Sequence, residues 1–319
     1  MLSCSQYFRR IELSELLAAV YWLVVGLLVV VFEAKIQNQH GLVGVAFLGT
    51  VVVAMLLCTL GSPYVLSRVS YSRRLLVRST IMFFNFYLAF MCLSFYAVQV
   101  HPTSYEAELM AIDTWLFGRP LVEILEPLLV SGVTDFVQVC YATHFLLPFF
   151  LLGVLLHNGK LDEAEILIAV YGFVLITLFL GYVVVPARSP YIIAGLPTMN
   201  HIVQFREPIP MTALGIAINE WIHSNEIFKF DCFPSGHTQL GMTVIIGSWR
   251  LHRKSFPFFL VVGGTLIFAT LYLRYHYVID LVAGALLSWA GWTFVPRWTQ
   301  IWYQRRNKDA NRTTAFNIS

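Results

Sequence analysis

Long apolar stretches separated by shorter polar segments run through most of this chain. A hydrocarbon core of ~30 Å is crossed by about 20 helical residues, and several stretches reach that length. The pattern predicts eight membrane-spanning helices, near residues 13–32, 42–62, 79–99, 133–156, 165–185, 237–251, 257–273 and 277–295. The fold class predicted is therefore all-α, a polytopic membrane helical bundle, in which the sixth and seventh spans are short.

The composition agrees with a membrane protein. Of the 319 residues, 58% are hydrophobic and 12% are charged, an apolar share well beyond that of soluble domains. We divide the chain into N-terminal transmembrane helices (1–70), a membrane catalytic domain (71–300) and a cytoplasmic tail (301–319) that we expect to be disordered. The lipid bilayer is thus the first expected partner, and the sequence leaves the oligomeric state open.

Basic residues predict the orientation, because loops rich in Lys and Arg stay in the cytoplasm. If both termini are cytoplasmic, fifteen of the 21 Lys and Arg residues lie on the inner side. The remaining six lie outside and are Lys35, Arg119, Arg188, Arg206, Lys229 and Arg274. The net charge of +3 is then a topology signal, and it gives no reason to expect a nucleic-acid partner.

Two long external segments interrupt the apolar pattern. In the first, residues 100–132, acidic and apolar residues alternate irregularly between Tyr105 and Gly118, which suits a helix lying along the membrane interface. The second, residues 186–236, holds six of the thirteen prolines. Because long loops in compact domains are usually functional, we expect the first segment to roof a site and the second to contribute to it.

Two short motifs place polar residues where membrane helices begin. In Pro234-Ser235-Gly236-His237, Ser235 suits a helix N-cap, and Gly236 lets an anion approach the backbone amides. In the second motif, His276 and Asp280 are four residues apart and would share one face of a helix. The carboxylate could then bind one ring nitrogen and leave the other free, which would also offset the cost of an acid in the membrane.

Three parts of the sequence converge on the same membrane boundary. Arg188 follows the outer end of the fifth predicted span, His237 opens the sixth, and His276 opens the eighth. Polar residues without a common role would be spread over both faces. The shared depth therefore favours one catalytic site, facing the lumen, the periplasm or the cell exterior.

These motifs resemble the type-2 phosphatidic acid phosphatase superfamily, whose members carry Pro-Ser-Gly-His and a later His-x-x-x-Asp. The resemblance covers roughly residues 165–295. The stretch Tyr272–Asp280 looks closest to the branch with bacterial lipid phosphatases and the inositol-phosphoceramide and sphingomyelin synthases. Membership implies a helical catalytic core and a lipid phosphate substrate.

The residue types fit phosphoryl transfer. His276 is the candidate nucleophile, Asp280 would orient its ring, and His237 would protonate the departing alkoxide and later deprotonate the acceptor. The phosphate-binding set is predicted to be Arg188, Ser235, Gly236 and Arg274, although either Arg could instead anchor at the interface. Possible headgroup contacts are Arg206, Lys229 and His144, and His144 suits a packing role equally well.

No metal or cofactor is expected from this residue set. The five cysteines show no paired spacing that would suggest a disulfide or a zinc site. We interpret Cys232, which borders the first motif, as a small buried hydrophobe.

Three positions depart from the family pattern. Gly181 stands where the family usually has a Lys, seven residues before the Arg that corresponds to Arg188. Ser189 replaces a Pro directly after that Arg, and Thr270 replaces an Arg six residues before the catalytic His. Such losses also occur in the phosphotransferase branch, whereas Gly236 matches the phosphatase form of its motif.

The sequence therefore leaves two enzymes open. The first is a metal-independent lipid phosphate phosphatase (a phosphoric ester hydrolase), and the alternative is a lipid phosphotransferase with the same phosphohistidine intermediate. A channel or transporter is disfavoured, because transport sites usually lie near the bilayer midplane.

Overall fold

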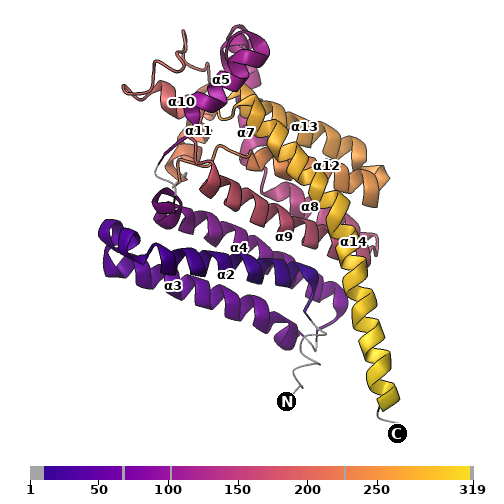
Figure 1. Ribbon diagram of the computed structural model, residues 1–319. Helices are drawn as coiled ribbons and strands as arrows, with labels where there is room; N and C mark the ends of the chain where they lie inside the picture. Colours follow the sequence, from indigo (N-terminus) through magenta and orange to yellow (C-terminus); the bar gives the residue numbers. More distant parts are fainter. Residues whose placement is uncertain (1–10, 67–68, 101–102, 226–227, 317–319) are drawn as a thin grey trace.

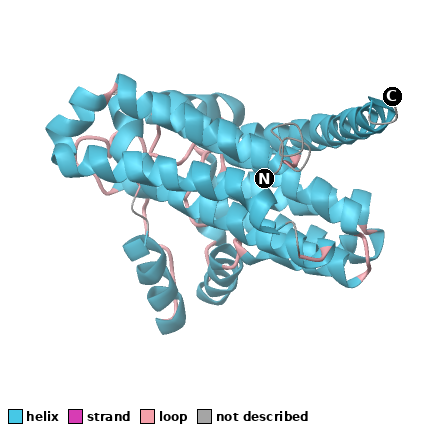
Figure 2. Ribbon diagram, turned by 90° about the horizontal axis from the view of Figure 1, so that it is seen from below, coloured by secondary structure: helices cyan, strands magenta, loops and turns pink. Residues whose placement is uncertain are grey.

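The computed structural model describes residues 11–66, 69–100, 103–225 and 228–316. Within this part the regular structure is entirely helical, and the single β-bridge joins Ala187 to Asp231. Figure 2 shows helices joined by loops throughout. The predicted all-α membrane bundle is confirmed.

Four long helices form the N-terminal half of the bundle and lie side by side in Figure 1. They are α2 (Leu13–Val31), α3 (Glu33–Val65), α4 (Tyr71–Val100) and α9 (Leu161–Val184). Their shared core includes Trp22 and Leu93, both fully buried, and Phe179 of α9. Apolar side chains recur along every one of these helices, so each can bury one face against its neighbours.

The second half of the bundle packs against the other side of α9. It comprises α7 (Ser131–Ala142), α8 (Leu146–His157), α12 (Gly236–Leu251), α13 (Phe256–Tyr272) and α14 (Val278–Phe316), with the short helix η3 (Arg253–Ser255) between α12 and α13. Leu167 and Val170 of α9 join Val244, Phe259 and Trp292 in this second core. Because α9 packs in both cores, its position in the bundle is fixed from two sides.

Six described helices are long and apolar enough to cross a membrane, and the α7–α8 pair, bent by 61°, would be a seventh span. The eight predicted spans correspond to these seven and to α12, which has 16 residues. The boundaries differ most at three places. Helices α3 and α4 start well before the predicted residues 42 and 79, and α3 kinks at Gly41. Helix α14 continues to Phe316 through most of the tail that we expected to be disordered.

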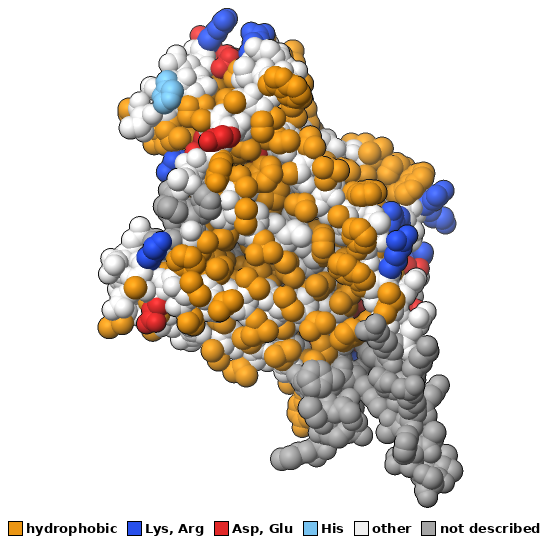
Figure 3. Space-filling view, in the orientation of Figure 1, with side chains coloured by type: hydrophobic (Ala, Val, Ile, Leu, Met, Phe, Trp, Pro, Cys, Tyr) orange, Lys and Arg blue, Asp and Glu red, His pale blue; other side chains and the backbone are white. Residues whose placement is uncertain are grey.

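The outer surface suits a bilayer. Large apolar side chains such as Leu57, Leu286 and Trp289 are more than half exposed. Figure 3 shows such side chains spread across the bundle, with basic side chains gathered mainly toward its ends. An apolar belt of this kind would be unfavourable in water, so the chain is a multi-pass integral membrane protein.

The elements outside the bundle gather at one end of it (Figure 1). They are α5 (Glu106–Phe117), α6 (Leu121–Ile124), η2 (Glu126–Leu128), α10 (Pro190–Ala194) and α11 (Ala213–Asn225). Helix α5 matches the helix predicted between Tyr105 and Gly118. Its Trp115 is 83% exposed, whereas Glu106 and Asp113 are only 1% exposed. The helix thus has an apolar outer face and an inner face that carries buried acids.

Candidate active site

The first motif forms the start of α12 as predicted. Ser235 is the N-cap, and its Oγ accepts a hydrogen bond from the Thr238 N–H at 3.2 Å. The Ser235 N–H donates to the Asp280 carbonyl at 3.1 Å, which ties this helix end to the second motif. A Cβ on Gly236 would lie 2.9 Å from the Tyr182 hydroxyl. Glycine is therefore needed here for close packing.

The second motif places His276 and Asp280 in contact. His276 Nδ1 lies 3.2 Å from Asp280 Oδ2, and the two residues are 3% and 0% exposed. His276 itself lies in the loop before α14, which begins at Val278, so the pair is joined across a turn and not along a helix face. The same Oδ2 accepts the Tyr277 N–H at 3.0 Å. This turn fixes the ring so that Nδ1 faces the acid.

Cys232 is buried in an apolar cluster, as expected, and its thiol also contacts this pair. Its Sγ lies 3.0 Å from Asp280 Oδ2, 3.3 Å from the Tyr275 carbonyl and 3.5 Å from His276 Nδ1. Burial, followed by the nearby Asp280 carboxylate, raises the pKa of the Cys232 thiol well above its ordinary value. The thiol therefore stays protonated and acts as a hydrogen-bond donor.

The three ligand atoms of Cys232, His276 and Asp280 lie within 4.8 Å of one another, and all three residues are buried. No metal-ligand cluster was expected from the sequence, because Cys232 is separated from the other two residues by more than forty positions along the chain. Thiol, imidazole and carboxylate are the groups that bind zinc. The fold thus creates a grouping that spacing in the sequence could not reveal.

His237 faces His276 from the start of α12. Their ring centroids are 5.7 Å apart, and the His237 ring stacks on Tyr141 at 4.1 Å. The His237 Nε2 is buried without a hydrogen-bond partner among the described residues. A substrate group between the two rings would give this atom a partner, as the predicted acid–base role requires.

His144, the third possible headgroup contact, lies beside His237. It sits in the break between α7 and α8, and its ring centroid is 4.3 Å from that of His237. Its Nδ1 is 2.6 Å from the Tyr141 carbonyl, so Nδ1–H donates there and orients the ring. His144 thus packs against the His237 ring and helps to fix its position.

Arg188 is brought to the same end by the loop after α9. The Cys232 N–H donates to the Ala187 carbonyl at 3.1 Å, next to the bridge between Ala187 and Asp231. The Tyr277 hydroxyl donates to the Arg188 carbonyl at 3.0 Å. Hence the predicted convergence of the Arg188, His237 and His276 segments is seen in the structure.

The Arg188 side chain is held by an acid from α5. Its Nη1 is 3.4 Å from Glu106 Oε1, and its guanidinium covers the Phe230 ring at 4.1 Å. The Arg188 side chain keeps 27% exposure, so part of the guanidinium remains accessible to an anion.

The Arg274 guanidinium contacts the external loop, whereas we expected it to bind phosphate. Its guanidinium donates to the Glu207 carbonyl at 3.1 Å and to Glu126 Oε1 at 3.2 Å, and it covers the Phe205 ring. Burial lowers the Arg274 pKa, and the Glu126 carboxylate acts against that shift. A buried guanidinium needs such partners, so Arg274 fastens the external loop and does not support our expectation.

The remaining candidates, Arg206 and Lys229, also belong to the external loop. Arg206 is exposed, and its backbone N–H donates to Glu126 Oε1 at 2.8 Å. Lys229 is partly buried in the connection between α11 and α12. The structure gives neither side chain a contact with the histidines among the interactions described.

Sequence reasoning missed three acids in the segment 100–132. Glu106 holds Arg188, Glu126 holds Arg274, and both Asp113 carboxylate oxygens accept the Val278 N–H at 2.9–3.0 Å. Asp113 thereby caps α14 two residues after His276. Burial raises the Asp113 pKa to about 6, with the Val278 hydrogen bond acting against the shift and Asp280 adding to it. The mixture of acidic and apolar residues in this segment was the sequence feature that could have pointed to these buried acids.

The departures from the family pattern have packing reasons. A Cβ on Gly181 would lie 2.1 Å from Pro234 Cδ, so the proline of the first motif occupies the space that a lysine side chain would need. Thr270 is fully buried, and its carbonyl accepts the backbone N–H groups of Tyr275 and His276. Both positions shape the turn and helix start that carry the histidines.

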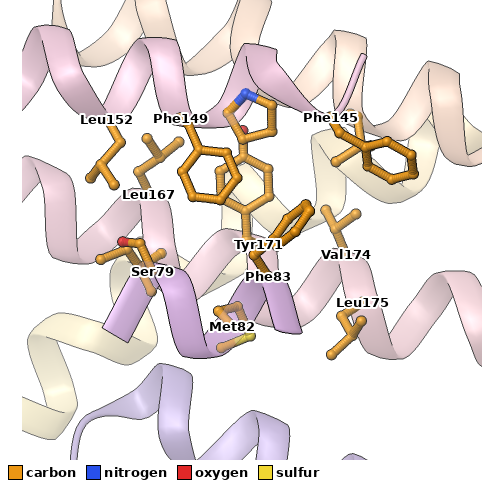
Figure 4. A pocket seen from close by; sticks show the side chains of 13 residues that line it. Ser79, Met82, Phe83, Phe145, Phe149, Leu152, Leu167, Tyr171, Val174 and Leu175 are labelled. Carbon is orange, nitrogen blue, oxygen red and sulfur yellow. The ribbon is translucent and has the colours of Figure 1, made fainter. Parts of the chain in front are cut away.

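An apolar cavity of about 70 Å³ lies between α4, α8, α9 and α12, just inward of the two neighbouring histidines. Phe145, which contacts His144, and Leu240, one turn after His237, line it. Figure 4 shows aromatic and aliphatic side chains converging on this space, with Tyr171 among them. A cavity with this lining favours hydrocarbon over water.

Two known proteins are similar to this chain over part of its length. The chain is 27% identical over 210 residues to inositol phosphorylceramide synthase of Candida albicans, covering 63% of this chain and 43% of that protein. It is 27% identical over 188 residues to the catalytic subunit of inositol phosphorylceramide synthase of Saccharomyces cerevisiae, covering 57% and 47%. The chain thus spans less than half the length of these relatives. No solved structure matches it.

A family model extends the likeness beyond the two motifs. It matches residues 107–294, starting in α5 and ending in α14, whereas the resemblance seen in the motifs covered roughly residues 165–295. The matched region therefore includes the acids Asp113 and Glu126 as well as the histidine motifs. This match over more than half of the chain shows that it belongs to the PAP2 superfamily, the type-2 phosphatidic acid phosphatases and their relatives.

Proposed function

We propose that the chain is a membrane enzyme that transfers a phosphate-bearing group from a lipid through a covalent intermediate on His276. The observation that carries this proposal is the buried His276–Asp280 pair facing His237. Burying ionisable side chains in a membrane protein costs free energy, so such residues usually serve a function. Membership of the PAP2 superfamily supports the same chemistry.

In the first step, His276 Nε2 attacks phosphorus. Nδ1–H donates to Asp280, so the lone pair is on Nε2, which makes it the nucleophilic atom. The bond from phosphorus to the lipid oxygen breaks as the bond to Nε2 forms. His237 gives its proton to the departing oxygen, and Asp280 stabilises the positive ring that results.

Positive charge and hydrogen-bond donors would hold the phosphate oxygens. Arg188 supplies the charge from a side chain already positioned by Glu106. Ser235 accepts a hydrogen bond from Thr238, which leaves its hydroxyl hydrogen available to a phosphate oxygen. The first amides of α12 add the donors typical of a helix N-terminus.

In the second step, His237 removes a proton from the acceptor, whose oxygen attacks phosphorus and releases His276. We favour a lipid hydroxyl as the acceptor, which makes the enzyme a phosphotransferase of the inositol-phosphoceramide or sphingomyelin synthase type. Both similar proteins reported above are inositol phosphorylceramide synthases. The apolar cavity beside His144 and His237 offers space for part of a second lipid chain.

Water is the second candidate acceptor, which would make the enzyme a lipid phosphate phosphatase. Gly236 favours it, because this residue matches the phosphatase form of the motif. The absence of a side chain at Gly236 also lets the start of α12 pack closely against Tyr182. Both reactions share the first step and differ only in what reaches the intermediate.

The test is an assay of the purified full chain in detergent with a panel of lipid phosphates, in the presence of a chelator. One arm contains water alone as acceptor, and the other adds lipid alcohols. A new phospholipid that needs the alcohol supports the transferase, and free phosphate in both arms supports the phosphatase. Unchanged turnover by a folded His276→Ala variant would reject both.

We also propose that the site faces away from the cytoplasm, as the distribution of basic residues suggests. Cysteines introduced at exposed positions near the site, such as His201, should react with a membrane-impermeant thiol reagent added from outside the compartment, before the membrane is opened. Reaction only after permeabilisation would reverse this assignment.

A further inference from the structure

We propose that Cys232, His276 and Asp280 form a binding site for a zinc ion, and that zinc bound there inhibits the enzyme. The binding part stands on the geometry alone, whereas the inhibition part rests on the proposed function of His276. No part of the reaction requires this ion. Zinc would act as a reversible blocker at a centre that works without it.

The spacing of the three ligand atoms is close to that around tetrahedral zinc. Metal–ligand distances of about 2.0–2.3 Å imply separations of roughly 3.3–3.6 Å between ligand atoms. The Sγ to Nδ1 separation is 3.5 Å, Nδ1 to Oδ2 is 3.2 Å, and Sγ to Oδ2 is 3.0 Å. Shifts of a few tenths of an ångström would open this triangle enough to seat the ion on one face.

A second observation points to a missing ligand at the same place. Asp280 is fully buried, and its Oδ1 has no hydrogen-bond partner among the described residues. A buried carboxylate oxygen without a partner is unfavourable. Zinc could take either oxygen of this carboxylate, so binding would also relieve this deficit.

The charges balance when zinc binds. The Cys232 S–H bond breaks, a sulfur–zinc bond forms, and the proton leaves to solvent. The doubly positive ion is then matched by one thiolate and one carboxylate, with a neutral imidazole as third ligand. A neutral cluster suits a buried position far better than an unmatched ion, and three protein ligands leave a fourth position for water.

Binding at Nδ1 would disable His276. The ring proton that Nδ1 donates to Asp280 must move to Nε2, because the lone pair of Nδ1 now faces the metal. Nε2 then has no lone pair with which to attack phosphorus. Asp280 would also be bound to the ion, so it could no longer stabilise a positively charged ring.

The donor set predicts the selectivity of the site. Thiolate and imidazole favour zinc and cadmium, whereas magnesium and calcium prefer oxygen ligands. We therefore expect Zn²⁺ and Cd²⁺ to bind, and Mg²⁺ and Ca²⁺ to have no effect at the same concentrations.

Binding is tested on the full chain by Cd²⁺ titration, using the ultraviolet charge-transfer absorbance of the cadmium–thiolate bond. The variant is Cys232→Ala, and the matched control is Cys140→Ala, which removes a thiol from α7. We expect Cys232→Ala to lose about one cadmium–thiolate bond per chain, and Cys140→Ala to match the unmodified protein in this component. Zn²⁺ should displace the cadmium signal.

Inhibition is tested in parallel with the lipid assay. Zn²⁺ should inhibit the unmodified protein reversibly, and Cys232→Ala should need at least ten-fold more Zn²⁺ for the same fractional inhibition. A Cys232→Ser variant, which keeps a hydroxyl donor toward Asp280, serves if the alanine variant is poorly folded, and we expect the same shift from it.

An unchanged cadmium signal in folded Cys232→Ala or Cys232→Ser would overturn the site. Equal sensitivity of these variants and the unmodified protein to Zn²⁺ would overturn the inhibition. If the chain turned over no lipid phosphate at all, the proposed function would fail, while the cadmium titration would still decide the metal site.

Discussion

One carboxylate oxygen lies at the middle of the proposed catalytic centre. Asp280 Oδ2 contacts the His276 ring, the Tyr277 N–H and the Cys232 thiol. These neighbours come from two parts of the chain, and they fix the position of the acid. Its orienting effect on His276 thus depends on the whole turn.

Replacing His276 with alanine should abolish turnover, and Asp280→Asn should reduce it by roughly 10²–10⁴-fold. Asparagine can still accept the Tyr277 N–H, so the turn should form, but it cannot balance a positive ring. Turnover of both variants is measured after their melting temperature in detergent confirms folding.

The matched control is His157→Ala, which removes an exposed histidine at the end of α8. It should keep full activity. Comparable losses in the control and in His276→Ala would argue against a specific role for His276.

Because the pKa of Asp113 is raised, we expect the free energy of unfolding to depend on pH. Burial raises the folded pKa of Asp113 from 3.8 to about 6. The proton is therefore held more tightly in the folded state, so the stability gained from protonated Asp113 is present below pH 3.8 and is lost as the pH rises through 6. Asp113→Asn keeps an acceptor for the Val278 N–H and removes this loss.

The melting temperature of Asp113→Asn relative to the unmodified protein should thus increase between about pH 4 and about pH 7. Glu108→Gln, which alters an acid elsewhere on α5, is the control and should show a flat difference. A constant difference for Asp113→Asn over this range would contradict the assignment.

The motif residues could be predicted from the sequence, because their neighbours along the chain define them. Ser235 as an N-cap and the His276–Asp280 pair depend on short spacing. The structural role of Arg274 and the contacts of Cys232 depend on residues far away in the chain. Spacing carries no information about such partners.

At the scale of helices, glycines let α9, α12 and α14 approach one another closely at the site. A Cβ on Gly284 of α14 would lie 2.7 Å from the Ser235 carbonyl, and one on Gly181 of α9 would lie 2.1 Å from Pro234 Cδ. The two motifs are brought together by these contacts. The small side chains are thus a requirement of the site's geometry.

Gly181→Ala should therefore destabilise the protein by about 1–3 kcal/mol, as overpacking does, and should lower activity by displacing Pro234. Gly264→Ala in α13 is the matched control, because its Cβ would meet nothing within 4 Å. Alanine favours a helix over glycine by about 1 kcal/mol, so the control should be neutral or stabilised. Equal melting temperatures for the two variants would disprove the close contact.

Helix positions followed well from apolar stretches, whereas helix breaks did not. The α7–α8 break at His144 and the kink of α3 at Gly41 lie within or beside apolar sequence. An apolar stretch has the same character whether the helix within it is straight or bent. The break matters for the site, because it places His144 next to His237.

At the scale of the molecule, α9 packs in two cores. A buried ionic cluster holds its N-terminal end, opposite the end that leads to Arg188. Arg78 of α4 bonds Glu15 of α2 at 3.1 Å and Glu165 of α9 at 3.2 Å. Ser62 of α3 donates to the same Glu15 at 2.7 Å. All four helices of the N-terminal half meet at this cluster, far from the histidines along α9.

Arg78→Ala should cost about 3–5 kcal/mol of stability, because it leaves buried carboxylates without their cation. Lys254→Ala removes an exposed charge from η3 and should change stability little. Thermal unfolding in detergent compares the two variants, and a loss in the control as large as that in Arg78→Ala would show that burial is not the cause.

The overall architecture was predictable because membrane thickness dictates helix length. The sequence did not predict how α5 and η2 hold the site through Glu106, Asp113 and Glu126. Those contacts join segments far apart in the chain, and each acid alone is typical of a solvated surface residue.

The most direct test of the proposed mechanism is to trap the covalent intermediate. The chain is mixed with a radiolabelled lipid phosphate, quenched rapidly, and the labelled residue is mapped by mass spectrometry. We predict one acid-labile label, located on His276, present in the unmodified protein and absent from His276→Ala. An active enzyme labelled at another residue, or one that turns over substrate with no label on His276, would contradict the mechanism.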